Sequence, residues 1–132
     1  MLYLDASALV KRYVDEEGRD VVLRAMEKAS TWSICRIGFV ETMRAVALAV
    51  GVSVVKRVES EWPAFEVIEV DRDLAEHAAL LTRSNELRAL DALHLASALV
   101  LPPGDLTVAT WDVHLHHAAR DHGLATLPVA LG

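Results

Sequence analysis

The sequence predicts a single α/β domain built on a mainly parallel sheet. Short apolar segments alternate along the chain with amphipathic helical patterns, and no linker, repeat or low-complexity segment divides them. The length of 132 residues suits one domain. Hydrophobic residues make up 53% of the chain and charged residues 24%, which is enough to form a buried core and excludes global disorder. We therefore expect residues 1–132 to fold as one unit.

The expected strands are short apolar or alternating segments between turn residues. They are Met1–Leu4, Trp32–Ile34, Phe65–Val70, Leu106–Thr110 and Leu124–Val129. Pro128 cannot donate a backbone hydrogen bond, so the last strand is expected at an edge of the sheet.

The expected helices carry apolar residues at spacings of three and four. They are Ala6–Val14, Asp20–Ala29, Ile37–Val50, Val54–Trp62, Asp73–Thr82, Leu87–Leu101 and Val113–His122. Pro63 and Pro102 end two of them, and Gly123 follows the last. Asp73, with Glu76 three residues later, predicts the N-cap of the fifth helix.

Composition and charge exclude several classes of protein. The single Cys35 cannot form an internal disulfide, so a disulfide scaffold is excluded and a reducing cytoplasm is the expected compartment. Asp5 interrupts the apolar N-terminus, and the apolar segment Leu87–Leu101 is too short and too charged to span a bilayer. The net charge of −6 argues against non-specific nucleic-acid binding through a basic surface.

Two acidic residues follow predicted strands. Asp5 comes directly after the first strand, and Asp112 comes just after Leu106–Thr110. Because ligands of such sheets gather at the carboxyl ends of the strands, both side chains are expected at the functional edge.

Two further acids, Glu41 and Asp91, interrupt predicted apolar helix faces. The apolar residues on these faces are Ile37, Ala45 and Leu48 for Glu41, and Leu87, Leu95 and Ala98 for Asp91. A buried carboxylate is costly unless an opposite charge, protonation or a bound cation compensates it. Arg44 and Arg88, each three residues away from one acid, are candidate ion-pair partners.

Four acids at one edge favour a bound cation over separate ion pairs. Asp5, Glu41, Asp91 and Asp112 offer only oxygen ligands, which select the hard ions Mg²⁺ or Mn²⁺. Such an ion can lower the pKa of a water, orient it in line with a phosphodiester and neutralise the developing charge. These four residues are the candidate metal ligands and catalytic residues.

Two hydroxyl side chains lie close in sequence to the candidate site. Ser7 follows Asp5 by two residues, and Thr110 precedes Asp112 by two. No His–acid pair is arranged around Ser7 in a nucleophile motif, so we expect both hydroxyls to hydrogen-bond to carboxylates.

The segments that carry these residues together resemble PIN-domain ribonucleases. They are LYLDASALVKRY with Asp5, FVETMRA with Glu41, LRALDALHLASAL with Asp91, and ATWDVHLHHAARDHGL with Thr110 and Asp112. More narrowly, their order and spacing at this length are similar to the VapC toxins of type II toxin–antitoxin systems.

The resemblance implies more than the residues alone. It implies a three-layer α/β/α fold, an acidic site dependent on Mg²⁺ or Mn²⁺ that cleaves RNA, a homodimer and a cognate VapB-like antitoxin. A cation at the acids would let RNA approach this acidic protein locally. The candidate phosphate contacts are Lys11, Arg12, Arg36, Arg44 and Arg88.

Other interpretations remain open at this point. A PIN-like domain with an inactive site would act as a binding module instead of an enzyme. His114, His117 and Asp121 could hold Zn²⁺ on one helix face, although exposed histidines are usually solvated. His94 is expected in the core or behind a metal ligand, not as a ligand itself.

Two other enzyme classes fit poorly. A phosphatase of the haloacid dehalogenase type needs a second Asp where Ser7 stands, and a dinucleotide-binding domain needs a glycine-rich first turn. The three tryptophans suit either core packing or a partner-binding surface. They are Trp32, Trp62 and Trp111.

Overall fold

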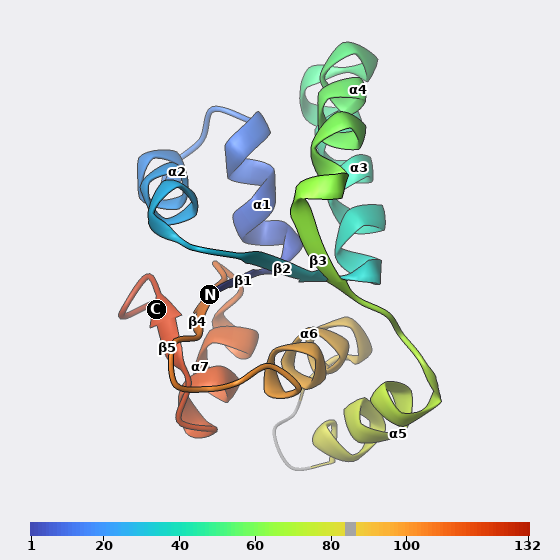
Figure 1. Ribbon diagram of the computed structural model, residues 1–132, viewed down its shortest axis with the longest axis vertical. Helices are drawn as coiled ribbons and strands as arrows, with labels where there is room; N and C mark the ends of the chain where they lie inside the picture. The colour runs from blue at the N-terminus through green and yellow to red at the C-terminus, as the bar shows by residue number, and fades with distance from the viewer. Residues whose placement is uncertain (84–86) are drawn as a thin grey trace.

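The computed structural model describes residues 1–83 and 87–132. Within these ranges, five parallel strands form one sheet in the order β3-β2-β1-β4-β5 (Figure 1). The strands are β1 (Leu2–Leu4), β2 (Trp32–Cys35), β3 (Phe65–Ile68), β4 (Thr107–Ala109) and β5 (Ala125–Leu127). The central strand β1 is buried along its whole length, which is why it reads as a continuous apolar segment. As expected, β5 lies at an edge of the sheet, but it ends at Leu127, directly before Pro128.

Helices cover both faces of the sheet. One face carries α1 (Ala6–Tyr13), α2 (Arg19–Lys28), α3 (Arg36–Val50) and α4 (Val52–Glu61), and the other carries α5 (Arg72–Leu81), α6 (Ala89–Leu99) and α7 (Val113–Asp121) (Figure 1). A short 3-10 turn, Trp62–Ala64, joins α4 to β3. The expected three-layer α/β/α fold is thus confirmed.

Two hydrophobic clusters fill the space between the layers. Leu2 and Leu4 of β1 pack toward α1–α4, whereas Tyr3 packs with Leu95 of α6 and Leu115 of α7 on the other face. This alternation is the ordinary two-residue period of a strand, and it directs the Tyr3 side chain toward α6. Among the described residues, no helix is long and apolar enough to cross a membrane.

Two predictions about helices are wrong. Asp71, not Asp73, caps α5, because its side chain accepts the hydrogen bond from the Leu74 N–H at 2.9 Å and leaves Asp73 in the first turn. The face that contains Glu41 is also not the buried face of α3. Phe39, Thr42 and Val46 point into the core instead.

The reason lies in the position of α3. This helix runs past the sheet and pairs with α4 as an arm at one end of the molecule (Figure 1). Leu48, counted in the sequence as a core position, is therefore 72% exposed. Glu41 lies on the flank of the helix, half-buried.

Several element boundaries differ by a few residues. The third strand ends at Ile68 instead of Val70, and α6 spans Ala89–Leu99 instead of starting at Leu87. Such shifts leave the layers unchanged, since helix and strand ends are where local pattern is least informative.

Candidate functional site

Asp5 stands where β1 ends and α1 begins, and its carboxylate is held from three sides. Oδ1 accepts hydrogen bonds from the Ala8 N–H at 3.0 Å and the Ser7 hydroxyl at 2.7 Å. Oδ2 accepts one from the Thr110 hydroxyl at 2.6 Å. Burial raises the pKa of this carboxyl, while the hydrogen bonds from Thr110, Ser7 and the Ala8 N–H oppose the rise. The side chain is therefore fixed in one orientation at the carboxyl edge of the sheet.

Thr110 connects Asp5 to Asp112. Its buried hydroxyl donates to Asp5 and accepts a hydrogen bond from the Asp112 N–H at 3.0 Å. Asp112 caps α7, and its Oδ1 accepts from the N–H groups of His114 and Leu115 at 2.9 and 3.1 Å. Within the described residues no hydrogen bond uses Oδ2 of Asp112, so this oxygen remains available to a ligand.

Asp91 lies in the first turn of α6, and its carboxyl is affected by the negative charges of Asp5 and Asp112. Burial raises the pKa of its carboxyl, and the negative charges of Asp112 and Asp5 raise it further, against the opposing charge of Arg88. A divalent cation would relieve such repulsion between like charges.

Glu41 is connected to this edge by a hydrogen bond with a histidine. His94 of α6 is 3% exposed, and its Nε2 lies 2.7 Å from Glu41 Oε1. The other ring nitrogen, Nδ1, lies 2.6 Å from the hydroxyl of Tyr3. The sequence placed His94 near a ligand or in the core, but it gave no role to Tyr3. A buried tyrosine must hydrogen-bond its hydroxyl, and that requirement was the available clue.

The donor chemistry of these residues fits a divalent cation. Asp5, Asp91 and Asp112 supply only hard oxygen atoms, and the charges of Asp112 and Asp5 both raise the pKa of the Asp91 carboxyl. In residues 1–83 and 87–132, however, no three His, Cys, Asp or Glu side chains form a preformed metal-binding group. Because Asp5 and Asp112 are anchored by hydrogen bonds, binding an ion would require the Asp91 carboxylate to move toward them.

Three of the five candidate phosphate contacts are engaged elsewhere. Lys11 is buried and donates to a carboxylate at 3.1 Å, Arg12 donates two hydrogen bonds at 3.0 and 2.9 Å, and Arg36 donates at 2.8 Å. Their carboxylate partners are Glu16, Glu61 and Glu69, respectively. Arg44 and Arg88 are exposed and form no ion pair with another described residue.

The histidine ladder on α7 and the tryptophans lie outside this arrangement. His114, His117 and Asp121 are exposed, and they belong to no metal-binding group in the described part of the chain. The three tryptophans are half-buried and pack against the core on the α1–α4 face. Core packing therefore accounts for them.

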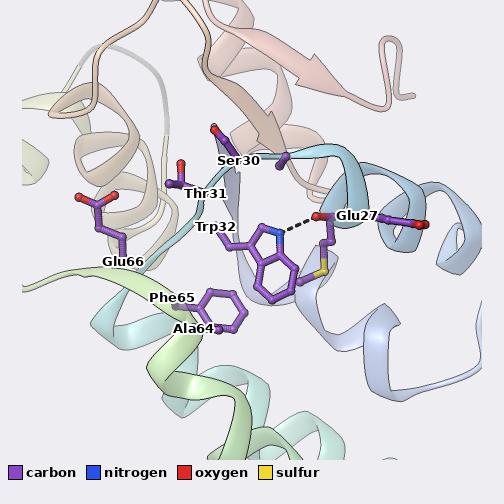
Figure 2. Close-up of a pocket in the computed structure, with 9 residues that line it drawn as sticks. Glu27, Ser30, Thr31, Trp32, Ala64, Phe65 and Glu66 are labelled. Carbon is purple, nitrogen blue, oxygen red and sulfur yellow. Dashed lines mark hydrogen bonds between the residues drawn. The ribbon is translucent and has the colours of Figure 1, made fainter.

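A hollow of about 460 Å³ lies at the opposite edge of the sheet. Trp32 and Phe65, the first residues of β2 and β3, line it together with Glu27 and Glu66 (Figure 2). The Trp32 indole donates a hydrogen bond to the carbonyl oxygen of Met26 at 2.7 Å (Figure 2). Since the strands are parallel, this amino edge is distant from the acids, which follow the carboxyl ends.

Known proteins share both the sequence and the fold. The model of the PIN domain matches residues 2–120. Ribonuclease VapC45 of Mycobacterium tuberculosis is 31% identical, over 99% of this chain and 97% of that protein. The crystal structure of M. tuberculosis VapC20, a Sarcin-Ricin loop cleaving toxin, superposes with a TM-score of 0.76 at 17% identity, covering 89% of this chain and 95% of that one.

A toxin-antitoxin complex from Klebsiella pneumoniae has the same fold. Its TM-score is 0.69 at 22% identity, over 85% of this chain and 87% of that one. The structural matches support the fold, and the family follows from the domain model and from the full-length relative. The chain therefore belongs to the PIN-domain family, in the group of VapC ribonucleases.

Proposed function

We propose that residues 1–132 form a single PIN domain that cleaves RNA as an endonuclease dependent on Mg²⁺, with Mn²⁺ as a substitute. The observation that carries this proposal is the convergence of Asp5, Asp91 and Asp112, from three separate elements, on one edge of the sheet. Their charges repel one another, so a divalent cation is the natural counter-charge.

The residues that would hold the cation are Asp5, Asp91, Asp112 and Glu41. When bound, the cation neutralises the phosphate and activates a water for in-line attack on the phosphodiester. Asp5 and Asp112 are already anchored by hydrogen bonds from Ser7, Thr110 and backbone N–H groups. Their orientation therefore needs little reorganisation during the reaction.

Arg44 and Arg88 are the candidate phosphate contacts that remain. Arg44 follows Glu41 by three residues in α3, and Arg88 precedes Asp91 by three residues, at the N-cap position of α6. Both side chains are exposed, so their guanidinium groups are accessible to RNA phosphates.

The biological role that fits this enzyme is the toxin of a type II toxin–antitoxin pair. The partner would be a VapB-like antitoxin, and the toxin would form a homodimer in the cytoplasm. Clustered carboxylates are a ready target for an Arg or Lys of the antitoxin, which could occupy the position of the cation. Inhibition should then weaken as the Mg²⁺ concentration rises.

Expression in cells tests this role. Production of the chain alone should arrest growth, and co-expression with the short reading frame upstream should restore growth and give a stable complex on size exclusion. Unimpaired growth and no complex, together with no cleavage of RNA in Mg²⁺ or Mn²⁺, would support the alternative of an inactive PIN-like binding module.

A further inference from the structure

A continuous hydrogen-bond chain runs from the core to Glu41. The Cys35 N–H donates to the Tyr3 hydroxyl at 3.2 Å, the hydroxyl lies 2.6 Å from His94 Nδ1, and His94 Nε2 lies 2.7 Å from Glu41 Oε1. Tyr3 and Cys35 are fully buried and His94 is 3% exposed, whereas the Glu41 side chain is 29% exposed. The chain therefore links the interior of the sheet to its functional edge.

The chemistry of the groups fixes the direction of this chain. A carboxylate only accepts, so His94 Nε2 must carry the hydrogen that points to Glu41. At the other end, the Tyr3 oxygen already accepts from Cys35 and has one hydrogen of its own to donate. Nδ1 of a neutral ring is the acceptor for that hydrogen. Burial raises the pKa of Tyr3 well above its ordinary value, so the phenol keeps this hydrogen.

The hydrogen bonds thus run in the order Cys35 to Tyr3 to His94 to Glu41, and each of these four groups has a partner in the chain.

Packing fixes the ring itself. Tyr3 and His94 meet edge to face with ring centroids 5.9 Å apart. On the other side, a Cβ at Gly38 of α3 would lie 3.2 Å from Cε1 of His94, so the glycine allows the helix to approach the ring. Glu41, one turn after Gly38, has no other hydrogen bond or ion pair within the described residues. Without His94 its carboxylate would be free to rotate.

We infer that His94 is a positioning residue for the nuclease site: anchored at Nδ1 by the Tyr3 hydroxyl, it donates a hydrogen bond from Nε2 and holds the Glu41 carboxylate at the functional edge. This inference rests on the proposed function, because it gives Glu41 a place in the cation site. Oε2 of Glu41 is then left for the ligand, as Oδ2 of Asp112 is. Partners that orient a metal-binding carboxylate typically contribute 10- to 100-fold in metal affinity or activity.

Two amide substitutions test the hydrogen bonds of the two His94 ring nitrogens separately. The amide of His94→Gln reaches about as far as Nε2 and can still donate to Glu41. The amide of His94→Asn reaches only as far as Nδ1, so it can bond to Tyr3 but not to Glu41. We expect His94→Asn to lower kcat for RNA cleavage and the affinity for Mn²⁺ by roughly 10- to 100-fold. His94→Gln should recover most of that loss, and Glu66→Gln, at the far edge, should match the wild type.

Comparing these two variants distinguishes a positioning role of His94 from a purely structural one. Equal loss in the Gln and Asn variants, with equal loss of Tm, or wild-type Mn²⁺ affinity in His94→Asn, would overturn the inference. Mn²⁺ affinity is measured on the full-length protein by electron paramagnetic resonance, so it does not depend on finding an RNA that is cleaved.

The tautomer is tested independently of activity. Long-range ¹H–¹⁵N correlation of the metal-free protein should show a proton on Nε2 of His94, and Tyr3→Phe should change the ¹⁵N shift of Nδ1. A bare Nε2 in the wild type would overturn the inference. If the wild type cleaves no RNA but the nitrogen shifts and the order of Mn²⁺ affinities are as expected, the proposed nuclease activity fails while the positioning of Glu41 stands.

Discussion

The two edges of the sheet differ in what they bury. At the carboxyl edge, Asp5 is 4% exposed and Thr110 is fully buried, and the Thr110 hydroxyl hydrogen-bonds both to the Asp5 carboxylate and to the Asp112 N–H. At the amino edge the hollow of about 460 Å³ is open, and its two carboxylates, Glu27 and Glu66, are exposed to solvent. The hollow at the amino edge is therefore not where the buried, hydrogen-bonded acids lie.

The difference shows what distinguishes a functional site in this fold. Exposed acids are stabilised by water and need no partner, whereas acids gathered in a partly dehydrated edge raise one another's pKa, as Asp91 shows. An evolved site retains such repulsion where a ligand relieves it. The four predictions below test this contrast, from the largest expected effect to the smallest.

The largest effect is expected from neutralising one aspartate of the carboxyl edge. Asp5→Asn, Asp91→Asn and Asp112→Asn should each lower the rate of RNA cleavage at least ~10³-fold, because each removes charge that binds the cation. Glu66→Gln removes one charge from the amino edge and should leave the rate unchanged. Gel-resolved cleavage of an end-labelled RNA measures all four, and full activity of Asp91→Asn would contradict the site assignment.

A smaller loss is expected from Thr110→Val, which preserves shape but removes a hydroxyl. Asp5 Oδ2 loses its donor, and the Asp112 N–H loses its acceptor. We expect activity to fall about 10- to 100-fold and the free energy of unfolding to fall by about 1–3 kcal/mol. Chemical denaturation and the same cleavage assay check this. A loss of stability with unchanged cleavage would show that Thr110 serves only the fold.

Trp32→Phe removes one hydrogen-bond donor at the amino edge, as Thr110→Val removes a hydroxyl at the carboxyl edge. The indole N–H no longer donates to the Met26 carbonyl, so the free energy of unfolding should fall by about 1 kcal/mol. Cleavage should not change, since the residue is at the wrong end of the strands. Reduced cleavage by a variant that remains folded at the assay temperature would contradict the claim that only the carboxyl edge takes part in catalysis.

The smallest effect concerns the stability of the metal-free protein. The pKa of Asp91 is raised in the folded state, so its neutral form favours folding below its ordinary pKa, and this contribution is lost as the pH rises through the raised value. Asp91→Asn should thus be more stable than the wild type by about 0.5 kcal/mol at about pH 7, a modest figure because the side chain is half-exposed.

The difference should vanish below about pH 3, where the wild-type carboxyl is neutral in both states. Thermal unfolding in EDTA at both pH values measures it. Addition of Mn²⁺ should reverse the order at neutral pH by stabilising the wild type selectively. A wild type that is more stable than Asp91→Asn in EDTA would mean that the acids do not repel one another.

The positions of the strand-end residues were predictable because they follow from the order of strands and helices along the chain. A parallel sheet brings its carboxyl ends to one edge, so Asp5, Thr110 and Asp112 could be placed from the alternation of strands and helices. Asp91 was predictable because its neighbours Leu95 and Ala98 are buried as their spacing indicates.

Glu41 and Tyr3 show where prediction from sequence stops. Helical periodicity indicates which residues share a face, but it does not say how far a helix extends beyond the sheet, and α3 does so as an arm. The contact from Tyr3 through His94 to Glu41 joins residues separated by 91 and 53 positions. Only the packing of β1, α3 and α6 brings them together.

The cation dependence of RNA cleavage tests the central claim most directly. The purified protein, dialysed against EDTA, is incubated with end-labelled RNA while Mg²⁺ or Mn²⁺ is titrated, with Asp91→Asn alongside. We predict no cleavage in EDTA, saturable cleavage as either ion is added, and none by the variant. Full cleavage by the wild type in excess EDTA would contradict the assignment of the acidic edge as a divalent-cation nuclease site.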